Sequence, residues 1–439
     1  MRLRTAAPVR VGGREQQISK LEFVSHGDSL HAVSPTRLGA ALLGNSLRAL
    51  DDWNTEVLTR GQNVSLTAFL RRGSFLTPEL LRETIRYSVE CSHRDVNVFQ
   101  PHARDARAKL FVPGTAIKGA IRAAVLWALA CPDRTNRYVR ETGESRARFY
   151  ARDLDRELLQ SYPLAGRNAG GGGPRFDLMR AVKVSDAYGS VKSRVEKILV
   201  QSYTDSGRGR VSALGASDTI YVECLEPGST VEFDFKVDQH ILESFRRESP
   251  DLPFEDEGSL LDLVRTFYKE VWDFERRYYG LAGGVGDEEP SGDAEGEPPS
   301  FEDWLRHAKG VELDDLSRRQ RNPLRAEYRR AFDLFETDSG GGIRERSPAP
   351  AAPSAGVRDG EIRLGRISGF YGGECPGFRL GWGSGLMSTT LDLHLGDEEM
   401  GKVLKLVNSR HHRGDPSDGP KSRRLVERGG EPRWPMGWA

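Results

Sequence analysis

The sequence is poor in cysteine. Its four cysteines (Cys91, Cys131, Cys224 and Cys375) are scattered along 439 residues and form no CxxC pair. Zinc sites and disulfide frameworks need thiols at short or regular spacings, so this pattern argues against both. We therefore expect small buried thiols in a protein of the reducing cytoplasm.

Long apolar runs are missing too. No stretch approaches the roughly 18 apolar residues that a membrane-spanning helix needs. The N-terminal segment 1–17 lacks the apolar core of a secretory signal. We expect no membrane span and no membrane partner.

Recognisable catalytic motifs are also absent. The nine histidines show no HExxH spacing, Ser384 lies in GWGSGL rather than in a GxSxG elbow, and no glycine run leads into GKS or GKT. The sequence thus predicts no catalytic residue, no metal site and no cofactor. One candidate stays open: Asp186 follows the apolar segment 181–185, where it could be a metal ligand, a general base or a turn residue at the end of a strand.

The net charge is zero, but the charges are unevenly distributed. Residues 1–210 contain 34 Lys and Arg against 21 Asp and Glu, whereas residues 211–357 contain 17 against 32. The tail, 358–439, is nearly balanced, with 13 against 11. A basic N-terminal half beside an acidic middle indicates a local site for a polyanion. Alternatively, the acidic middle only solvates an insert.

Hydrophobic periodicity predicts strands interleaved with helices. Short alternating segments form hairpin signals at 21–33 and, most clearly, at 219–224 with 230–237. Helical periodicity follows at 34–50, 116–130 and 133–160. This order predicts an α+β fold of ferredoxin-like type.

The length allows two or three domains. We divide the chain into an N-terminal domain, 1–240, an acidic helical insert, 241–357, and a C-terminal segment, 358–439. Within the insert, 282–300 and 338–357 are too poor in apolar residues to fold and are predicted to be disordered linkers. In the last segment we expect a strand at 388–395 and a helix at 397–408.

The segment 111–129, FVPGTAIKGAIRAAVLWAL, organises this prediction. Gly114 precedes Thr115, which stands where an N-cap belongs, and Lys118 and Arg122 are one helical turn apart. Cations at a helix N-terminus oppose the helix dipole, whereas a bound phosphate would favour the cations, the dipole and the free N–H groups together. We interpret this helix start as a site for a nucleic-acid backbone. Alternatively, it is an ordinary amphipathic helix with a polar face.

A second strong feature is a glycine-rich stretch. Seven glycines lie within 17 residues, 369–385, interleaved with aromatic residues and one arginine. Glycine permits a close backbone approach to phosphates, and neighbouring aromatic and Arg side chains can stack on unpaired bases. The residues that we expect to contact RNA here are Arg379, Gly381, Trp382, Gly383, Ser384 and Gly385. A plain flexible connection is the alternative.

Four separated segments together resemble one family. The N-terminal run that contains TAAPVRVGG, the segment FVPGTAIKGAIR, the loop RLGWGSGLMSTTL and the tail PKSRRLVERGGEPRWPMGWA are similar to motifs of CRISPR-associated RAMP proteins. The tail is most similar to one branch, the 3′-end (fifth) subunit of the type III-A Csm effector complex. Ser388-Thr389-Thr390 departs from the usual Ser-Lys-Thr and lacks one potential phosphate cation.

The resemblance implies two RAMP modules of RRM (ferredoxin-like) type and a non-catalytic, RNA-binding role. Such a subunit binds the 3′ region of crRNA, caps the filament of backbone subunits and meets target RNA indirectly. It also supports crRNA maturation by host nucleases and thereby antiviral defence. We add Arg10, Gly12, Gly13 and Arg14 of the N-terminal motif to the expected RNA contacts.

Two alternatives remain open. The first is a RAMP-type endoribonuclease that cuts crRNA precursor or target RNA through Asp186 or a histidine such as His26. The second is a cap that binds only proteins, with the acidic middle docked on basic neighbours.

Overall fold

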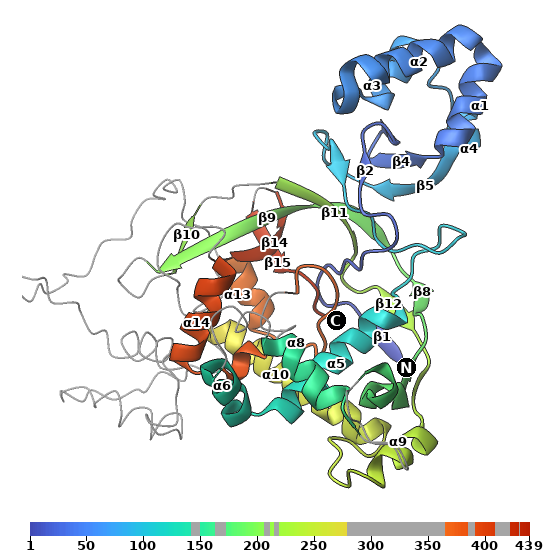
Figure 1. Cartoon of the computed structure of the whole chain (residues 1–439). Helices are drawn as coiled ribbons and strands as arrows, with labels where there is room; N and C mark the ends of the chain where they lie inside the picture. The colour runs from blue at the N-terminus through green and yellow to red at the C-terminus, as the bar shows by residue number, and fades with distance from the viewer. Residues whose placement is uncertain are drawn as a thin grey trace, which may run out of the picture.

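A computed structural model describes residues 1–141, 150–162, 173–205, 211–214, 219–278, 365–384, 391–408, 422–429 and 431–439. Figure 1 shows an N-terminal lobe, in blue, above a larger body in which the two termini lie near each other. The two predicted linkers, 282–300 and 338–357, lie outside the described residues.

The N-terminal lobe packs four helices on one side of three strands. The hairpin β3 (Phe23–His26) and β4 (Ser29–Val33) was predicted correctly, and β4 pairs next with β5 (Ile85–Glu90). The covering helices are α1 (Pro35–Asn45), α2 (Leu47–Arg60), α3 (Leu66–Arg72) and α4 (Pro78–Thr84).

The single helix expected over 34–50 is in fact two helices. Ser46 adopts an extended conformation between α1 and α2, with φ −169°, and its side chain accepts a hydrogen bond from Ala49 N–H. A serine that caps the next helix in this way ends the first one. Leu42, Leu66 and Leu70, fully buried, form the core of the lobe.

The large sheet is organised around one long strand, β9 (Ser193–Asp205). Antiparallel to it lie β11 (Thr219–Leu225), β10 (Val211–Leu214) and β14 (Ser422–Arg428), and β14 pairs with β15 (Glu431–Pro435). β5 reaches β9 at Glu90 and Arg194, which connects the lobe to the body. Strands from three distant parts of the chain therefore share one sheet.

The predicted hairpin at 219–237 is wrong in its pairing. Both segments are extended, but β11 pairs with β9, while β12 (Thr230–Glu232) lies between β1 (Arg2–Arg4) and β8 (Tyr188–Ser190). Burial alternates along 230–237, whereas residues 221–225 are all buried, and in neither segment does the apolar pattern specify the partner strand.

Two short antiparallel pairs complete the β structure of the described residues. β13 (Phe235–Val237) pairs with β7 (Val182–Val184), and β2 (Ile18–Ser19) pairs with β6 (Val98–Phe99). The pair β7–β13 lies next to the helical core, because Val182 and Val237 are fully buried in the same cluster as α5.

Two helices, α5 (Gly114–Ala130) and α10 (Glu257–Tyr278), form the centre of the body. Ile121 and Val125 of α5 belong to the same apolar cluster as Phe267 and Trp272 of α10. Since α10 was assigned to the acidic insert, this part of the insert is integral to the main core. The three-part division of the chain stays a prediction.

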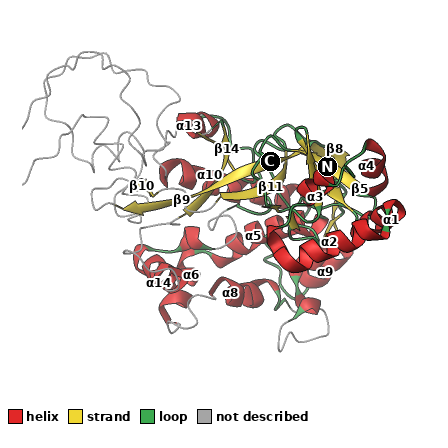
Figure 2. Ribbon diagram, turned by 90° about the horizontal axis from the view of Figure 1, so that it is seen from above, coloured by secondary structure: helices red, strands yellow, loops and turns green. Residues whose placement is uncertain are grey.

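Further helices surround this pair: α6 (Pro132–Glu141), α8 (Tyr150–Leu159), α9 (Gln239–Arg246), α13 (Gly365–Tyr371) and α14 (Asp397–Asn408). Figure 2 shows α5, α6, α8 and α14 on one side of the long strand β9. The helix at 397–408 is confirmed, whereas the described end of the expected strand 388–395 forms a 3-10 turn, η6 (Asp392–His394). The α+β fold class is confirmed.

The cysteines were expected to be small buried thiols, and two of the four are buried. All four cysteines are free, and Cys91 and Cys224 are buried, but Cys131 at the junction of α5 and α6 is exposed. Among the described helices, none is by itself long and apolar enough to cross a bilayer. Only α5 and α6 taken together meet that test, and they are bent by 84° where they join.

Candidate nucleic-acid interface

The N-terminal basic segment and the glycine-rich loop lie against each other. Trp382 N–H donates to the carbonyl oxygen of Arg10 at 2.8 Å. Gly381 has φ +77°, and a Cβ there would lie 2.1 Å from that same oxygen. The close approach therefore requires glycine at this position, both for its conformation and for the lack of a side chain. Two segments that we assigned to one RNA strand are direct neighbours.

The indole ring of Trp382 lies among arginine side chains. The Cζ atom of Arg424, on β14, is 4.3 Å from the ring centroid, and that of Arg10 is 5.8 Å away. Burial lowers the pKa of both guanidiniums, and for Arg10 the charges of Cys224 and Glu223 partly oppose this effect. Both side chains stay charged, because the ordinary pKa of arginine is far above neutrality.

Arg424 was not among the residues expected to contact RNA. It lies in the C-terminal tail, whose resemblance to the family was noted as a whole. Arg424 precedes the buried residues Leu425 and Val426 and lies on the same face of the strand as Val426, so the local pattern carried no signal for its contact with Trp382.

The remaining residues of the N-terminal motif, Gly12, Gly13 and Arg14, are exposed. A Cβ on Gly13 would lie 3.1 Å from the Cα of Ala103, whose N–H donates to Val11 O at 2.9 Å. A Cβ on Gly12 would lie 3.3 Å from a guanidinium nitrogen of Arg10. Arg10 itself is buried, 8% exposed, and its Nε donates to Pro101 O at 3.3 Å, so the exposed part of this motif is Gly12, Gly13 and Arg14.

The end of the glycine-rich loop turns toward the C-terminal tail. Gly383 has φ +85°, and a Cβ there would lie 3.0 Å from the Cβ of Met436. Ser384 is buried. Gly385, the last predicted contact of the loop, lies outside the described residues.

Arg379, also predicted to contact RNA, is buried inside the body. Its guanidinium forms an ion pair with Glu275 of α10, and its Nε and Nη2 donate to Met436 O at 3.3 and 3.2 Å. The Cζ atom lies 5.0 Å from the ring centroid of Trp438. These contacts give Arg379 a place in the fold, where it anchors the start of the loop to α10.

The helix start at α5 differs from the prediction in its cap. The N-cap residue is Pro113, and the helix begins at Gly114, so the assignment of Thr115 as the N-cap is wrong. The N–H of Gly114 donates to Asp186 Oδ1 at 2.8 Å. A Cβ on Gly114 would lie 2.6 Å from Ser185 O, which leaves no room for a larger residue. A carboxylate of this chain therefore takes a place at the helix N-terminus where we expected a phosphate.

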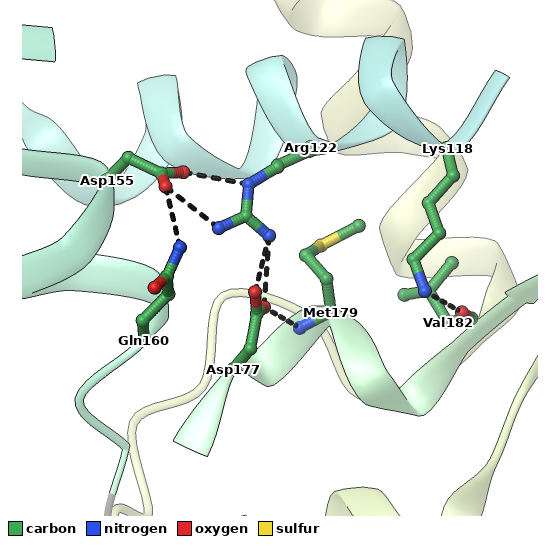
Figure 3. A network of polar contacts seen from close by, with 7 residues as sticks. All are labelled: Lys118, Arg122, Asp155, Gln160, Asp177, Met179 and Val182. Carbon is green, nitrogen blue, oxygen red and sulfur yellow. Dashed lines mark hydrogen bonds and ion pairs between the residues drawn. The ribbon is translucent and has the colours of Figure 1, made fainter. Parts of the chain in front are cut away.

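Lys118 and Arg122 share one face of α5, as their spacing predicted, and both bind groups of this chain (Figure 3). Lys118 Nζ donates to Val182 O at 2.8 Å, and burial together with Lys183 lowers its pKa. Arg122 forms ion pairs with Asp155 of α8 and with Asp177, each at 2.8 Å.

The two aspartates change the acid–base properties of Arg122. Burial lowers the pKa of its guanidinium, but the hydrogen bonds and charges of Asp155 and Asp177 outweigh burial, and the pKa is raised. Arg122 thereby joins α5 to α8 and to the 3-10 turn η3 (Leu178–Ala181), which Asp177 caps. RNA contacts by Lys118 and Arg122 stay a prediction.

Helix α10 lies between the two groups of predicted residues. The hydroxyl of Tyr268 donates to Ala120 O of α5 at 3.2 Å, while its ring packs 5.3 Å from Phe378 and 6.5 Å from Trp438. The structure thus brings Arg10–Arg14 and Gly381–Ser384 together and places Gly114–Arg122 across α10 from them.

Comparison with known proteins identifies the family. The RAMP superfamily profile matches residues 3–288, about two thirds of the chain. The chain belongs to the RAMP superfamily. No curated protein sequence matches this RAMP protein.

Two solved structures are similar to this RAMP protein. One is a chain of a Csm–crRNA–target RNA ternary complex of a type III-A CRISPR-Cas system, solved by cryo-EM, with 18% identity and a TM-score of 0.53 over 100% of this chain and 98% of that chain. The other is the crystal structure of Csm5 from T. onnurineus, with 16% identity and a TM-score of 0.49 over 100% and 99%. At 18% identity the likeness to the chain of the ternary complex shows a shared fold.

A buried polar network supports the N-terminal segment of this RAMP protein. The carboxylate of Glu223, fully buried on β11, accepts hydrogen bonds from Ser193 Oγ at 2.7 Å and from the backbone N–H of His102 at 3.0 Å. It also forms an ion pair with Arg104. His102 Nδ1 accepts from Val11 N–H at 3.2 Å, so its Nε2–H donates to Phe111 O at 3.0 Å. Burial lowers the pKa of His102 to about 3. The neutral imidazole fixes the backbone next to Arg10.

Asp186 was expected to be a metal ligand, a general base or a turn residue at the end of a strand. Its carboxylate accepts a hydrogen bond from the backbone N–H of Gly114 at the start of α5, and this structural contact favours the third role. In the part of the chain that the structure describes, no three His, Cys, Asp or Glu side chains gather to hold a metal ion. His26, the other residue named for catalysis, is exposed on β3, with its ring centroid 6.4 Å from that of His31.

Proposed function

We propose that this RAMP protein is a non-catalytic, crRNA-binding subunit of a type III-A CRISPR (Csm) complex in the cytoplasm. It binds the 3′ region of crRNA, caps the filament of backbone subunits beside its neighbouring subunit, and meets target RNA only through the assembly. By holding the crRNA end it supports trimming by host nucleases and, through the complex, antiviral defence.

One observation carries the RNA-binding part of this proposal: the contact between Arg10–Arg14 and Gly381–Ser384. It combines the exposed residues Gly12, Gly13 and Arg14, the guanidinium of Arg424 and the ring of Trp382 in one place, next to the buried Arg10. Cations hold phosphates, and a tryptophan ring stacks on any unpaired base, so the arrangement suits a single strand. Family membership and the fold similarity to a chain of a crRNA-containing complex support the same assignment.

Co-purification tests the proposal. A tagged copy expressed with its neighbouring CRISPR genes should bring down the other Csm subunits together with crRNA. Deletion of the gene should leave crRNA with longer or uneven 3′ ends in the remaining complex. Recovery of the protein without RNA, while the complex assembles normally on other subunits, would contradict the assignment and favour a cap that binds only proteins.

The endoribonuclease alternative needs a separate assay. We expect the purified chain to leave crRNA precursor and target RNA intact in the presence and absence of Mg²⁺. Cleavage that is lost in Asp186→Asn or His26→Ala, with the fold retained, would establish the alternative instead.

A further inference from the structure

Beyond Trp382 and Arg424, further Arg and Trp residues lie along β14 and β15. We call this row, which comprises Trp382, Arg424, Arg428, Arg433 and Trp434, the strip. In the register of these strands, Trp434 lies opposite Val426, two positions along β14 from Arg424. The ring of Trp434 lies 4.7 Å from the Cζ atom of Arg428 and 4.5 Å from that of Arg433. Neither Trp434 nor these arginines was among the residues expected to contact RNA.

Trp382 and Trp434 cover the same small apolar cluster of the sheet. Both rings pack, partly exposed, against buried residues of β9, β11 and β14, among them Ile198, Val222 and Val426. Alternate residues of a strand face the same side, so Arg424, Val426 and Arg428 are arranged in one row. The row from Arg424 to Arg428 is about 13 Å long, given about 3.3 Å per residue. Bases from one extended single strand of RNA can therefore reach the rings of both Trp382 and Trp434.

Charge on these strands favours a polyanion. Residues 422–435 contain four arginines and two glutamates. Glu427 pairs with Lys197 at 2.8 Å, and Glu431 lies opposite Arg428 in the register. The buried carboxylate of Glu196 anchors Arg428, whereas Arg433 is exposed and Arg424 is exposed except where its guanidinium lies against the ring of Trp382. An anchored guanidinium next to an indole ring offers a preformed stacking surface, and the exposed arginines can reach phosphates.

We propose that Trp434, flanked by Arg428 and Arg433, is a second base-stacking position for single-stranded RNA, continuous with the position at Trp382. This inference rests on the proposed function. It adds that the RNA strand runs along β14 and that the protein recognises unpaired bases of the RNA. Single-stranded RNA should therefore bind more tightly than a duplex of the same sequence, because paired bases cannot reach the rings.

The test measures RNA affinity of the purified full-length chain at several salt concentrations. Trp434→Leu should weaken binding of a single-stranded oligoribonucleotide about 10-fold, whereas Trp434→Phe, which keeps an aromatic face, should stay within about threefold. Arg433→Ala should lower the slope of log affinity against log salt by about 0.7, the value for one phosphate contact with a single strand. Arg137→Ala is the matched control, since Arg137 is an exposed arginine on α6, outside the strip, and should change neither quantity.

A second measurement does not depend on how Trp434 variants fold. The wild-type chain is photo-crosslinked to RNA that contains 4-thiouridine, and the adducts are mapped by mass spectrometry. Adducts on the peptide that contains Trp434 support the inference. Adducts at Trp382 alone, or unchanged affinity of a folded Trp434→Leu variant, overturn it and leave the proposed function standing. Crosslinks from this strip to a neighbouring subunit in the assembled complex also overturn it. Failure of the wild-type chain to bind RNA at all would instead remove the proposed function.

Discussion

The guanidinium of Arg379 and the carboxylate of Glu275 form an ion pair in which the two side chains are 0% and 1% exposed. Glu275 also accepts a hydrogen bond from Tyr371 Oη at 2.5 Å, so one carboxylate of α10 holds both α13 and the glycine-rich loop. An arginine in a glycine-rich, aromatic segment was expected to face RNA. Its burial beside a carboxylate makes it part of the support for Gly381 and Trp382, which follow it and are partly exposed.

Removing Arg379 should therefore destabilise the protein. Arg379→Met leaves the Glu275 carboxylate buried without its cation, which costs about 3–5 kcal/mol of unfolding free energy. Urea unfolding followed by circular dichroism measures the change. The control is Arg265→Met. Arg265 pairs with Asp262 at the surface, where the two side chains are 71% and 73% exposed, so this substitution should change the free energy of unfolding by less than about 0.5 kcal/mol. Equal effects of the two substitutions would contradict the role assigned to Arg379.

Measurements of stability and RNA binding decide whether Lys118 and Arg122 of α5 serve the fold, RNA binding or both. Arg122→Met should lower the free energy of unfolding by about 2 kcal/mol, because Asp155 and Asp177 lose their shared partner in a half-buried site. Arg82→Met, which removes an exposed pair with Glu79, is the control.

If Lys118 and Arg122 also contact crRNA, as the sequence predicts, Lys118→Ala combined with Arg122→Ala should flatten the salt dependence by about 0.7 per lost phosphate contact. A lower unfolding midpoint with an unchanged salt slope would assign both side chains to the fold alone.

Stability should fall as the pH drops below about 6.5, and His102 contributes to this fall. Its pKa is about 3 in the folded protein and about 6.5 in the unfolded chain, so the unfolded state binds more protons between these values. The contribution is fully present above pH 6.5 and is lost as the pH falls toward 3, by up to about 1.4 kcal/mol per pH unit.

Comparison with His102→Gln isolates this residue, because glutamine also offers one acceptor and donors but does not titrate. Between pH 7.5 and pH 5 the wild type should lose about 2 kcal/mol more than the variant. Burial also lowers the pKa values of His31 and His394, which act in the same direction in both proteins and cancel in the comparison. Parallel pH profiles would show that His102 is not responsible.

Gly381 should tolerate no side chain. Gly381→Ala places a Cβ 2.1 Å from Arg10 O at a φ of +77°, so the loop must move away from the N-terminal segment. We expect at least about 2 kcal/mol of destabilisation and weaker RNA binding. Gly377→Ala is the matched control, because Gly377 also has a positive φ, +94°, but open space around it, and should cost about 1 kcal/mol. Similar losses in both would mean that conformation alone, and not the contact with Arg10, requires glycine.

The sequence contained the local features of the site but not the contacts between distant segments. The spacing of Lys118 and Arg122 correctly placed them on one face of a helix, since the helical repeat fixes this. Which groups meet that face depends on Asp155 and Asp177, which come from elements folded separately. The same limit explains why β11 was given the wrong partner: a strand with one apolar face can pair with any strand that presents a matching one.

The contact of Arg10 with Gly381 and Trp382 joins residues near opposite ends of the chain, and local pattern carries no signal for such a contact. Glycine content did indicate where backbone would come close to another group. It did not indicate that the group at Gly381 is the carbonyl of Arg10, and at Gly114 the carbonyl of Ser185, rather than a phosphate. Trp434 and Arg433 were passed over because a basic tail with tryptophans has no fixed spacing that points to stacking.

The central place of β9 in the sheet has a consequence for synthesis in the cell. Glu196 on β9 and its partner Arg428 on β14 are 232 residues apart, so the ribosome makes one edge of β9 long before the strand that covers it. At about 5–20 residues per second, this edge waits for roughly 10–50 s with its backbone groups unpaired. Nascent chains shortened before β14 should therefore aggregate or recruit chaperones, and only the finished chain should be ready to join its assembly.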